Sequence, residues 1–110
     1  MKIHENTLGK YKIIKPEGRI NAANYEEFNR ALDKAVSTDE HIVVECTELS
    51  YISSAGMKSL LAYLKKCKEM DKELLLVNLQ PKIKEIFDIT GFTNMFRIYS
   101  SLSEVYDFDN

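Results

Sequence analysis

Two adjacent serines, Ser53 and Ser54, lie where a hydrophobic run gives way to a helical pattern, and Gly56 follows them. The stretch reads LSYISSAGM over residues 49–57. A serine before a helix most often caps it, because its oxygen accepts a backbone N–H of the first turn that has no other partner. In this interpretation Gly56 only permits the helix to pack closely against a sheet. A serine hydroxyl is also a group that covalent chemistry can use, as a nucleophile or as the acceptor of a transferred group.

The residues that nucleophilic and metal enzymes require are missing. A nucleophile elbow would need a glycine at position 52, where the chain has Ile52. The two histidines, His4 and His41, fall in predicted strands, and His41 lies at the far end of its strand from the serines. A phosphate-binding loop needs a longer glycine-rich cradle with a lysine, and no set of metal ligands has a recognisable spacing. We therefore expect that the chain is not an enzyme and carries no cofactor.

A serine at a helix N-terminus is well placed to receive a phosphate. The helix dipole and the free N–H groups there favour negative charge, so phosphorylation would not unfold the helix. It would add about −1.5 to −2 charges to an exposed loop and repel any partner that buries the neutral loop. Such a serine would be a switch that requires no conformational change. The spacing alone leaves both the cap and the switch open.

Strand signals dominate the first part of the chain. Residues 2–7 and 11–15 predict a hairpin that turns at Gly9. Pro16-Glu17-Gly18 predicts a second turn, followed by a short strand over residues 19–20. Asn21 is a predicted N-cap for a helix whose apolar residues recur every three or four positions. These apolar residues are Tyr25, Phe28, Leu32 and Ala35.

The rest of the chain alternates strands and helices. Residues 41–46 and 73–78 predict buried strands, and residues 96–99 predict a last strand. Helices are expected after Ser54, from Pro81 to before Gly91, and after Ser101. This order indicates the α/β class: one domain over residues 1–110, with helices packed on a mixed β-sheet. The stretch LSYISSAG is then a loop at the carboxyl end of the strand over residues 41–46.

Composition narrows the setting in which the chain works. With 15 basic and 17 acidic residues, the formal net charge is −2, which argues against direct binding to nucleic acid. No apolar run is long enough to span a membrane, and the polar N-terminus does not resemble a signal peptide. Cys46 and Cys67 sit in apolar surroundings and are expected to be reduced core thiols. A cytoplasmic location is the simplest expectation.

The order of elements, with LSYISSAGMKSLLAYLKK at its centre, resembles a STAS domain, and more narrowly the bacterial anti-sigma factor antagonists. The motif of that family is an apolar pair, then Asp-Ser-Ser/Thr-Gly-Leu. Here Ser53 takes the aspartate position and Ser54 that of the phosphorylated serine, while Gly56 and Met57 end the motif. Residues 18–21, Gly-Arg-Ile-Asn, are similar to the family's Gly-x-Leu-Asp. Residues 73–105 resemble the family's C-terminal part, so essentially the whole chain is covered.

Two departures from the family pattern affect the site. Asn21 and Ser53 replace the family's two loop aspartates, so the local negative charge is lower. Ser53 also supplies a second hydroxyl. The resemblance implies Ser54 as the phosphorylation site, with Ser53 as the second choice.

The resemblance implies regulation of transcription by partner switching. The unphosphorylated antagonist would bind an anti-sigma factor and free a sigma factor. The anti-sigma factor would also be a serine kinase that inactivates the antagonist, and a serine phosphatase would reverse this. Any ATP and magnesium would belong to the kinase. The expected partner-binding residues are Asn21, Tyr51, Ser53, Ser54, Gly56, Met57 and Lys58, although Met57 is as readily read as a core residue.

One alternative keeps the fold and changes the role. The chain would then be a STAS subunit of a signalling scaffold or of a lipid-transport complex. It would act purely by protein binding, through its helix face, and Ser54 would not matter.

Overall fold

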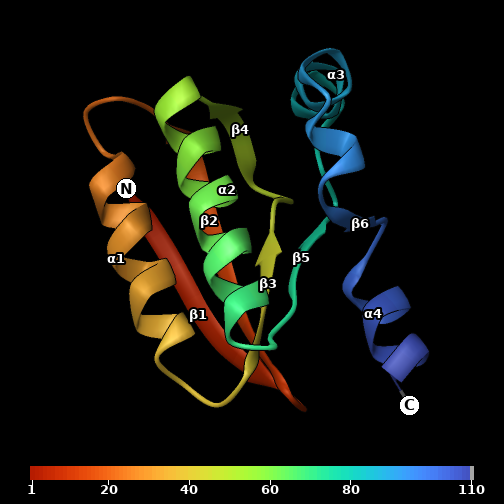
Figure 1. Ribbon diagram of the computed structural model, residues 1–110. Coiled ribbons are helices and arrows are strands. Elements are labelled where there is room, and N and C mark those ends of the chain that lie inside the picture. Colours follow the sequence, from red (N-terminus) through yellow and green to blue (C-terminus); the bar gives the residue numbers. More distant parts are fainter. Residues whose placement is uncertain (110) are drawn as a thin grey trace.

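Strands come first in the chain and then alternate with helices (Figure 1). The computed structural model describes the backbone of residues 1–109 and the side chains of residues 1–105. The strands are β1 (Lys2–Leu8), β2 (Tyr11–Ile20), β3 (His41–Glu45), β4 (Leu49–Ile52), β5 (Leu74–Val77) and β6 (Arg97–Tyr99). The α-helices are α1 (Tyr25–Val36), α2 (Ser54–Glu69), α3 (Pro81–Thr90) and α4 (Leu102–Asp109), and a 3-10 turn spans Phe92–Asn94.

The strands form one mixed sheet in the order β1-β2-β3-β5-β6, with β4 attached to β2 alone. β1 and β2 form the antiparallel hairpin that the sequence predicts, and Gly9 turns between them at φ +59°. All other pairings are parallel. Parallel neighbours need crossover connections, and the helices supply them. The predicted α/β class with a mixed sheet is confirmed.

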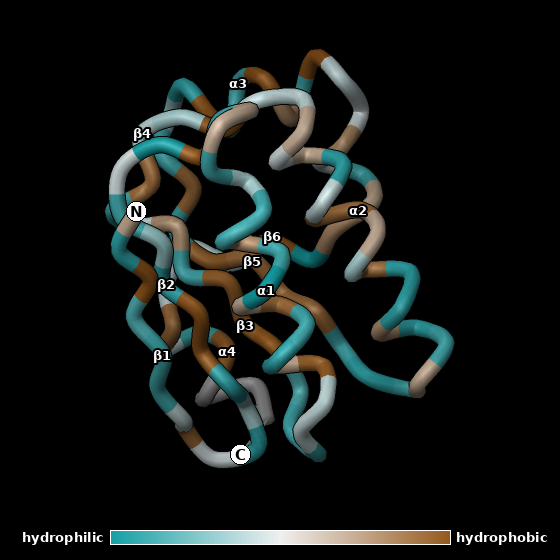
Figure 2. Tube along the Cα trace, turned by 90° about the vertical axis from the view of Figure 1, so that its left-hand side faces the viewer, coloured by the Kyte–Doolittle hydropathy of each residue, from teal (hydrophilic) through white to brown (hydrophobic). Residues whose placement is uncertain are grey.

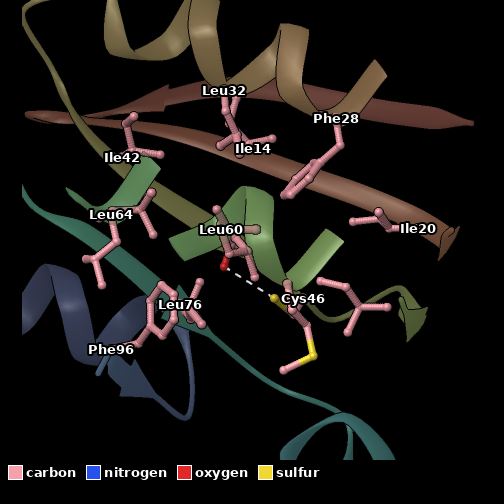
Figure 3. Packing of buried hydrophobic residues seen from close by; sticks show 14 of the residues in the cluster. Ile14, Ile20, Phe28, Leu32, Ile42, Cys46, Leu60, Leu64, Leu76 and Phe96 are labelled. Carbon is pink, nitrogen blue, oxygen red and sulfur yellow. Dashed lines mark hydrogen bonds between the residues drawn. The ribbon is translucent and has the colours of Figure 1, made fainter. Parts of the chain in front are cut away.

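Helices cover both faces of the sheet. The central strands are therefore buried on both sides and carry apolar residues at successive positions. α1 and α2 lie side by side on one face, where Phe28 and Leu32 of α1 point toward Ile14 of β2 (Figures 1 and 3). On the other face Val105 of α4 packs against Val43 of β3 and its neighbours. Successive residues of a strand point to opposite faces, so burial on both sides requires a continuous apolar run. Figure 2 shows such runs in β3 and β5.

The sequence predicts a turn at residues 16–18, and the structure corrects this. β2 continues through Pro16 and Gly18 to Ile20 and changes neighbour on the way. It pairs with β3 through Ile14 and with β4 from Gly18 onward. Pro16 falls between the two pairings, where its missing N–H removes no hydrogen bond to either strand. Gly18 has φ +86° where the register shifts.

A second correction concerns the start of α1. Asn21 does not cap this helix, which begins at Tyr25 after Asn24. Instead the Asn21 side-chain oxygen accepts the N–H of Ala23 at 2.9 Å and that of Asn24 at 3.1 Å. The Asn21 carbonyl also accepts the N–H of Tyr25 at 2.9 Å. Asn21 therefore holds a turn that joins β2 to α1.

The later helix boundaries agree with the sequence. Pro81 opens α3, and Gly91 ends it in the left-handed conformation at φ +82°. The Ser101 hydroxyl accepts the N–H of Glu104 at 3.4 Å, which is one half of the predicted capping box, whereas the Glu104 carboxylate accepts the N–H of Ser100 at 3.0 Å in place of that of Ser101. Within the described residues, no helix combines the length and the apolar character needed to cross a membrane.

Candidate functional site

The stretch predicted as a loop before α2 contains a strand. β4 forms because Leu49 and Ile52 are buried and its backbone pairs with the end of β2. The Ser53 N–H extends this pairing and donates to the Ile20 carbonyl at 2.8 Å. Ser53 and Ser54 therefore follow the carboxyl end of β4, and the Asn21 turn follows the carboxyl end of the adjacent β2. The pairing brings Asn21 and the two serines, distant in sequence, to one edge of the sheet.

Ser53 is the N-cap of α2. Its backbone is extended, with φ −81° and ψ 172°, and its Oγ accepts the N–H of Gly56 at 3.2 Å. The Ser53 carbonyl accepts the N–H of Met57 at 2.9 Å, which closes the first turn. The side chain is half-buried. The cap predicted for a serine at this position is confirmed for Ser53.

Ser54 is the first residue of α2 and is exposed. Its hydroxyl makes no hydrogen bond to any described residue of the chain, in contrast to that of Ser53. The first turn of α2 contains no acidic side chain. A negative group on Ser54 would thus meet the positive end of the helix dipole without a nearby carboxylate in that turn.

Gly56 lets α2 approach the sheet. A Cβ at this position would lie 2.7 Å from Ile20 Cγ2 and 2.7 Å from Ile52 Cγ1, too close for any side chain. Gly56 is buried between these two strand ends, and Met57 is 7% exposed within the core cluster. The core interpretation of Met57 is therefore correct, and the interpretation as an exposed contact is wrong. Gly56 and Met57 therefore hold the start of α2 against the sheet.

The remaining predicted residues surround Ser54 on the surface. Tyr51 is half-buried in β4, and Lys58 is exposed one helical turn after Ser54. Tyr51 pairs with Arg19 across the β2–β4 ladder, and the Arg19 guanidinium lies 4.2 Å from the centre of the Tyr51 ring. Sequence reasoning missed Arg19, because only the pairing of β2 with β4 places it beside Tyr51.

The chemistry available at this edge is that of an acceptor hydroxyl. His4 bonds Glu17 at 2.8 Å, and His41 Nδ1 accepts the N–H of Glu73 at 2.9 Å, so both rings are engaged with other groups. No cluster of potential metal ligands occurs among the described residues. The Ser54 hydroxyl is exposed at the first position of α2.

Comparison with known proteins adds to this geometry. The family model for the STAS domain matches residues 1–105. BtrV of Bordetella bronchiseptica, a candidate anti-sigma factor antagonist, is 35% identical over 86 residues, which are 77% of this chain and 74% of BtrV.

Solved structures show the same fold. An anti-sigma factor antagonist from Mycobacterium paratuberculosis is similar with a TM-score of 0.87 at 17% identity, covering 96% of this chain and 91% of that one. The phosphorylated form of SpoIIAA, a cell fate determinant of Bacillus, is similar with a TM-score of 0.76 at 15% identity, covering 99% of this chain and 100% of that one. Because the family model matches nearly the whole chain, this protein belongs to the STAS domain family.

Proposed function

We propose that this chain is an anti-sigma factor antagonist that phosphorylation of Ser54 switches off. In its unphosphorylated form it binds an anti-sigma factor, which then releases a sigma factor to RNA polymerase. The anti-sigma factor is also the serine kinase, and a serine phosphatase restores the active form. The chain itself acts by binding and not by catalysis, in the cytoplasm. The names of its relatives support this role.

The observation that carries the proposal is the division of tasks between the two serines. Ser53 is occupied as the cap of α2, whereas the hydroxyl of Ser54 is exposed and unbonded among the described residues. Transfer of the γ-phosphoryl group of ATP to Ser54 Oγ, with loss of the hydroxyl proton and release of ADP, would leave the cap intact. The geometry thus favours Ser54 over Ser53 as the acceptor.

The docking surface consists of the exposed and half-buried residues around that hydroxyl. These are Asn21, Tyr51, Ser53, Ser54 and Lys58. A partner that covers Ser54 removes it from water. Burying an unpaired phosphate there would cost several kcal/mol, while about 1.4 kcal/mol already changes an affinity tenfold. Phosphorylation would therefore weaken binding by orders of magnitude.

Calorimetric titration with purified anti-sigma factors of the source organism tests the proposal. We expect unmodified protein and Ser54→Ala to bind one of them with similar affinity, and Ser54→Asp to bind it at least about tenfold more weakly. Mass spectrometry after incubation with that factor and ATP should place the phosphate on Ser54. Equal binding by Ser54→Ala and Ser54→Asp would contradict the switch and favour a scaffold or transport subunit. A phosphate on Ser53 would contradict the assignment of the acceptor.

A further inference from the structure

A groove between α1 and α2 begins directly beside Ser54. It has a volume of about 600 Å³ and is lined by residues of both helices. Ala55, which follows Ser54, lies at one end, and Lys66, three turns along α2, lies at the other. α1 contributes Tyr25 and Asn29 to the opposite wall. The groove is therefore continuous with the docking surface around Ser54.

The charge of this groove is positive. Lys58 and Lys66 line it, and no acidic residue does. Lys66 is partly neutralised, because its Nζ lies 3.5 Å from Asp33 Oδ1, and the Tyr63 hydroxyl donates to that same oxygen at 2.7 Å. Lys58 has no ion pair with any described residue. Lys58 is thus the cation that remains available, and it lies nearest to Ser54.

Asn29, one of the residues that line the groove, has an unsatisfied acceptor. Asn29 Oδ1 is buried, and within the described part of the chain it has no hydrogen-bond partner. A buried polar atom without a partner costs free energy, and most such atoms in folded proteins are satisfied. The groove therefore offers a positive charge at Lys58 and a site that requires an N–H or O–H donor at Asn29.

We propose that this groove receives an acidic polypeptide segment of the anti-sigma factor. A carboxylate of the segment pairs with Lys58, and a backbone N–H of the segment donates to Asn29 Oδ1 after the Asn29 amide turns toward the groove. A fully ionised free anion such as sulfate would satisfy Lys58 alone, because it supplies acceptors and no donor, whereas a peptide supplies both. From Ala55 to Lys66 the groove runs about 16 Å along the helix, the length of about five residues of extended chain. This inference rests on the function proposed above and identifies what the partner presents.

Charge reversal at Lys58 tests the groove. The titrant is the purified anti-sigma factor identified by the calorimetry above. We expect Lys58→Glu to weaken binding by about tenfold or more, since it places like charges together. Lys65→Glu is the matched control: Lys65 is exposed on the same helix, does not line the groove, and undergoes the same change of charge. Its affinity should stay within about twofold of the unaltered protein. Equal losses in the two variants would overturn the inference and leave the proposed function standing.

Asn29→Leu provides a second test, which combines the stability of the free protein with its affinity for the partner. Removing the unsatisfied oxygen should raise the Tm of the free protein by about 4 °C while weakening binding to the anti-sigma factor. A higher Tm together with a lower affinity is expected if Asn29 Oδ1 lacks a donor in the free protein and gains one from the partner. Unchanged affinity in this variant would overturn the inference. If the unaltered chain bound no anti-sigma factor of the organism, both this inference and the proposed function would fail.

Discussion

At the scale of single residues, Ser53 and Ser54 are chemically identical, yet their contributions to stability should differ. Ser53→Ala removes the hydroxyl that accepts the N–H of Gly56, and losing such a cap costs about 1 kcal/mol. Ser54→Ala removes a hydroxyl without a bond to the described residues and should change the free energy of unfolding by less than about 0.5 kcal/mol. Urea denaturation of the two variants measures both values. A larger loss in Ser54→Ala would show that Ser54 is the structural serine.

Gly56 permits a close approach, and any side chain there should be costly. In Gly56→Ala the new methyl group would meet Ile20 and Ile52 at 2.7 Å, so α2 or both isoleucines must move. Overpacking of this kind typically costs about 1–3 kcal/mol, here opposed by the better helix propensity of alanine. Urea denaturation should show a clear loss of stability. Ala62→Gly, at an exposed position of the same helix, is the control for propensity alone. A more stable Gly56→Ala would contradict the packing described above.

At the scale of elements, the contact between α1 and α2 includes a polar link. The Tyr63 hydroxyl of α2 donates to Asp33 of α1 at 2.7 Å. Partial burial is the main cause that raises the pKa of Tyr63 to about 12, and the nearby Asp33 carboxylate is the second. In turn, the hydrogen bond from Tyr63 lowers the pKa of Asp33. The link therefore depends on a protonated phenol beside an ionised carboxylate.

This link predicts a specific alkaline dependence. The folded-state pKa of Tyr63 is raised to about 12, above its ordinary value of about 10. Its contribution to stability is therefore complete below about pH 10 and is lost as pH rises toward 12. Tyr63→Phe should reduce the slope of unfolding free energy against pH in that window and cost less than about 1 kcal/mol at neutral pH, because the pair is largely exposed. Urea denaturation of both proteins from pH 8 to 11.5 gives the two slopes. Parallel slopes would mean that the link is absent in solution.

At the scale of the whole molecule, the two thiols report on global unfolding. Cys46, which follows β3 (Figure 3), and Cys67, which lies in α2, are both buried in the core and form no disulfide, as the sequence predicts. Burial raises the pKa of Cys46 to about 12 and also raises that of Cys67, so neither is a thiolate at neutral pH. Under native conditions, a thiol reagent such as DTNB should react with these cysteines only in the molecules that are transiently unfolded. Added urea should then accelerate labelling in proportion to the unfolded population. Rapid labelling of either cysteine in the native protein would contradict this.

Those parts of the fold that local sequence determines were predictable. The buried strands β3 and β5 appear as continuous apolar runs, and Gly9, Pro81 and Gly91 mark turns and helix ends through their own backbone preferences. What depends on contacts between distant segments was not predictable. The exchange of neighbours along β2 and the strand β4 exist only because residues 18–20 meet residues 49–52.

The same distinction applies to the site. Ser53, Ser54 and Gly56 could be identified because they are adjacent in the sequence and carry a helix-start signal. The positions of Arg19 beside Tyr51 and of Asn29 in the groove between α1 and α2 could not be predicted, since each residue gains its neighbours from packing between elements. The burial of Met57 also follows from the way α2 sits on the sheet.

The exposure of the Ser54 hydroxyl has a kinetic consequence. If a serine is buried, an enzyme can modify it only after local or global unfolding, and the rate of modification then depends on how often unfolding occurs. Ser54 already lies at the surface, on a helix that its neighbour caps. If Ser54 is phosphorylated as we propose, the fraction of the protein that carries the phosphate would be set by the amounts and activities of the kinase and the phosphatase. A destabilised variant of this protein should be phosphorylated at nearly the same rate as the unaltered chain for as long as most of its molecules remain folded.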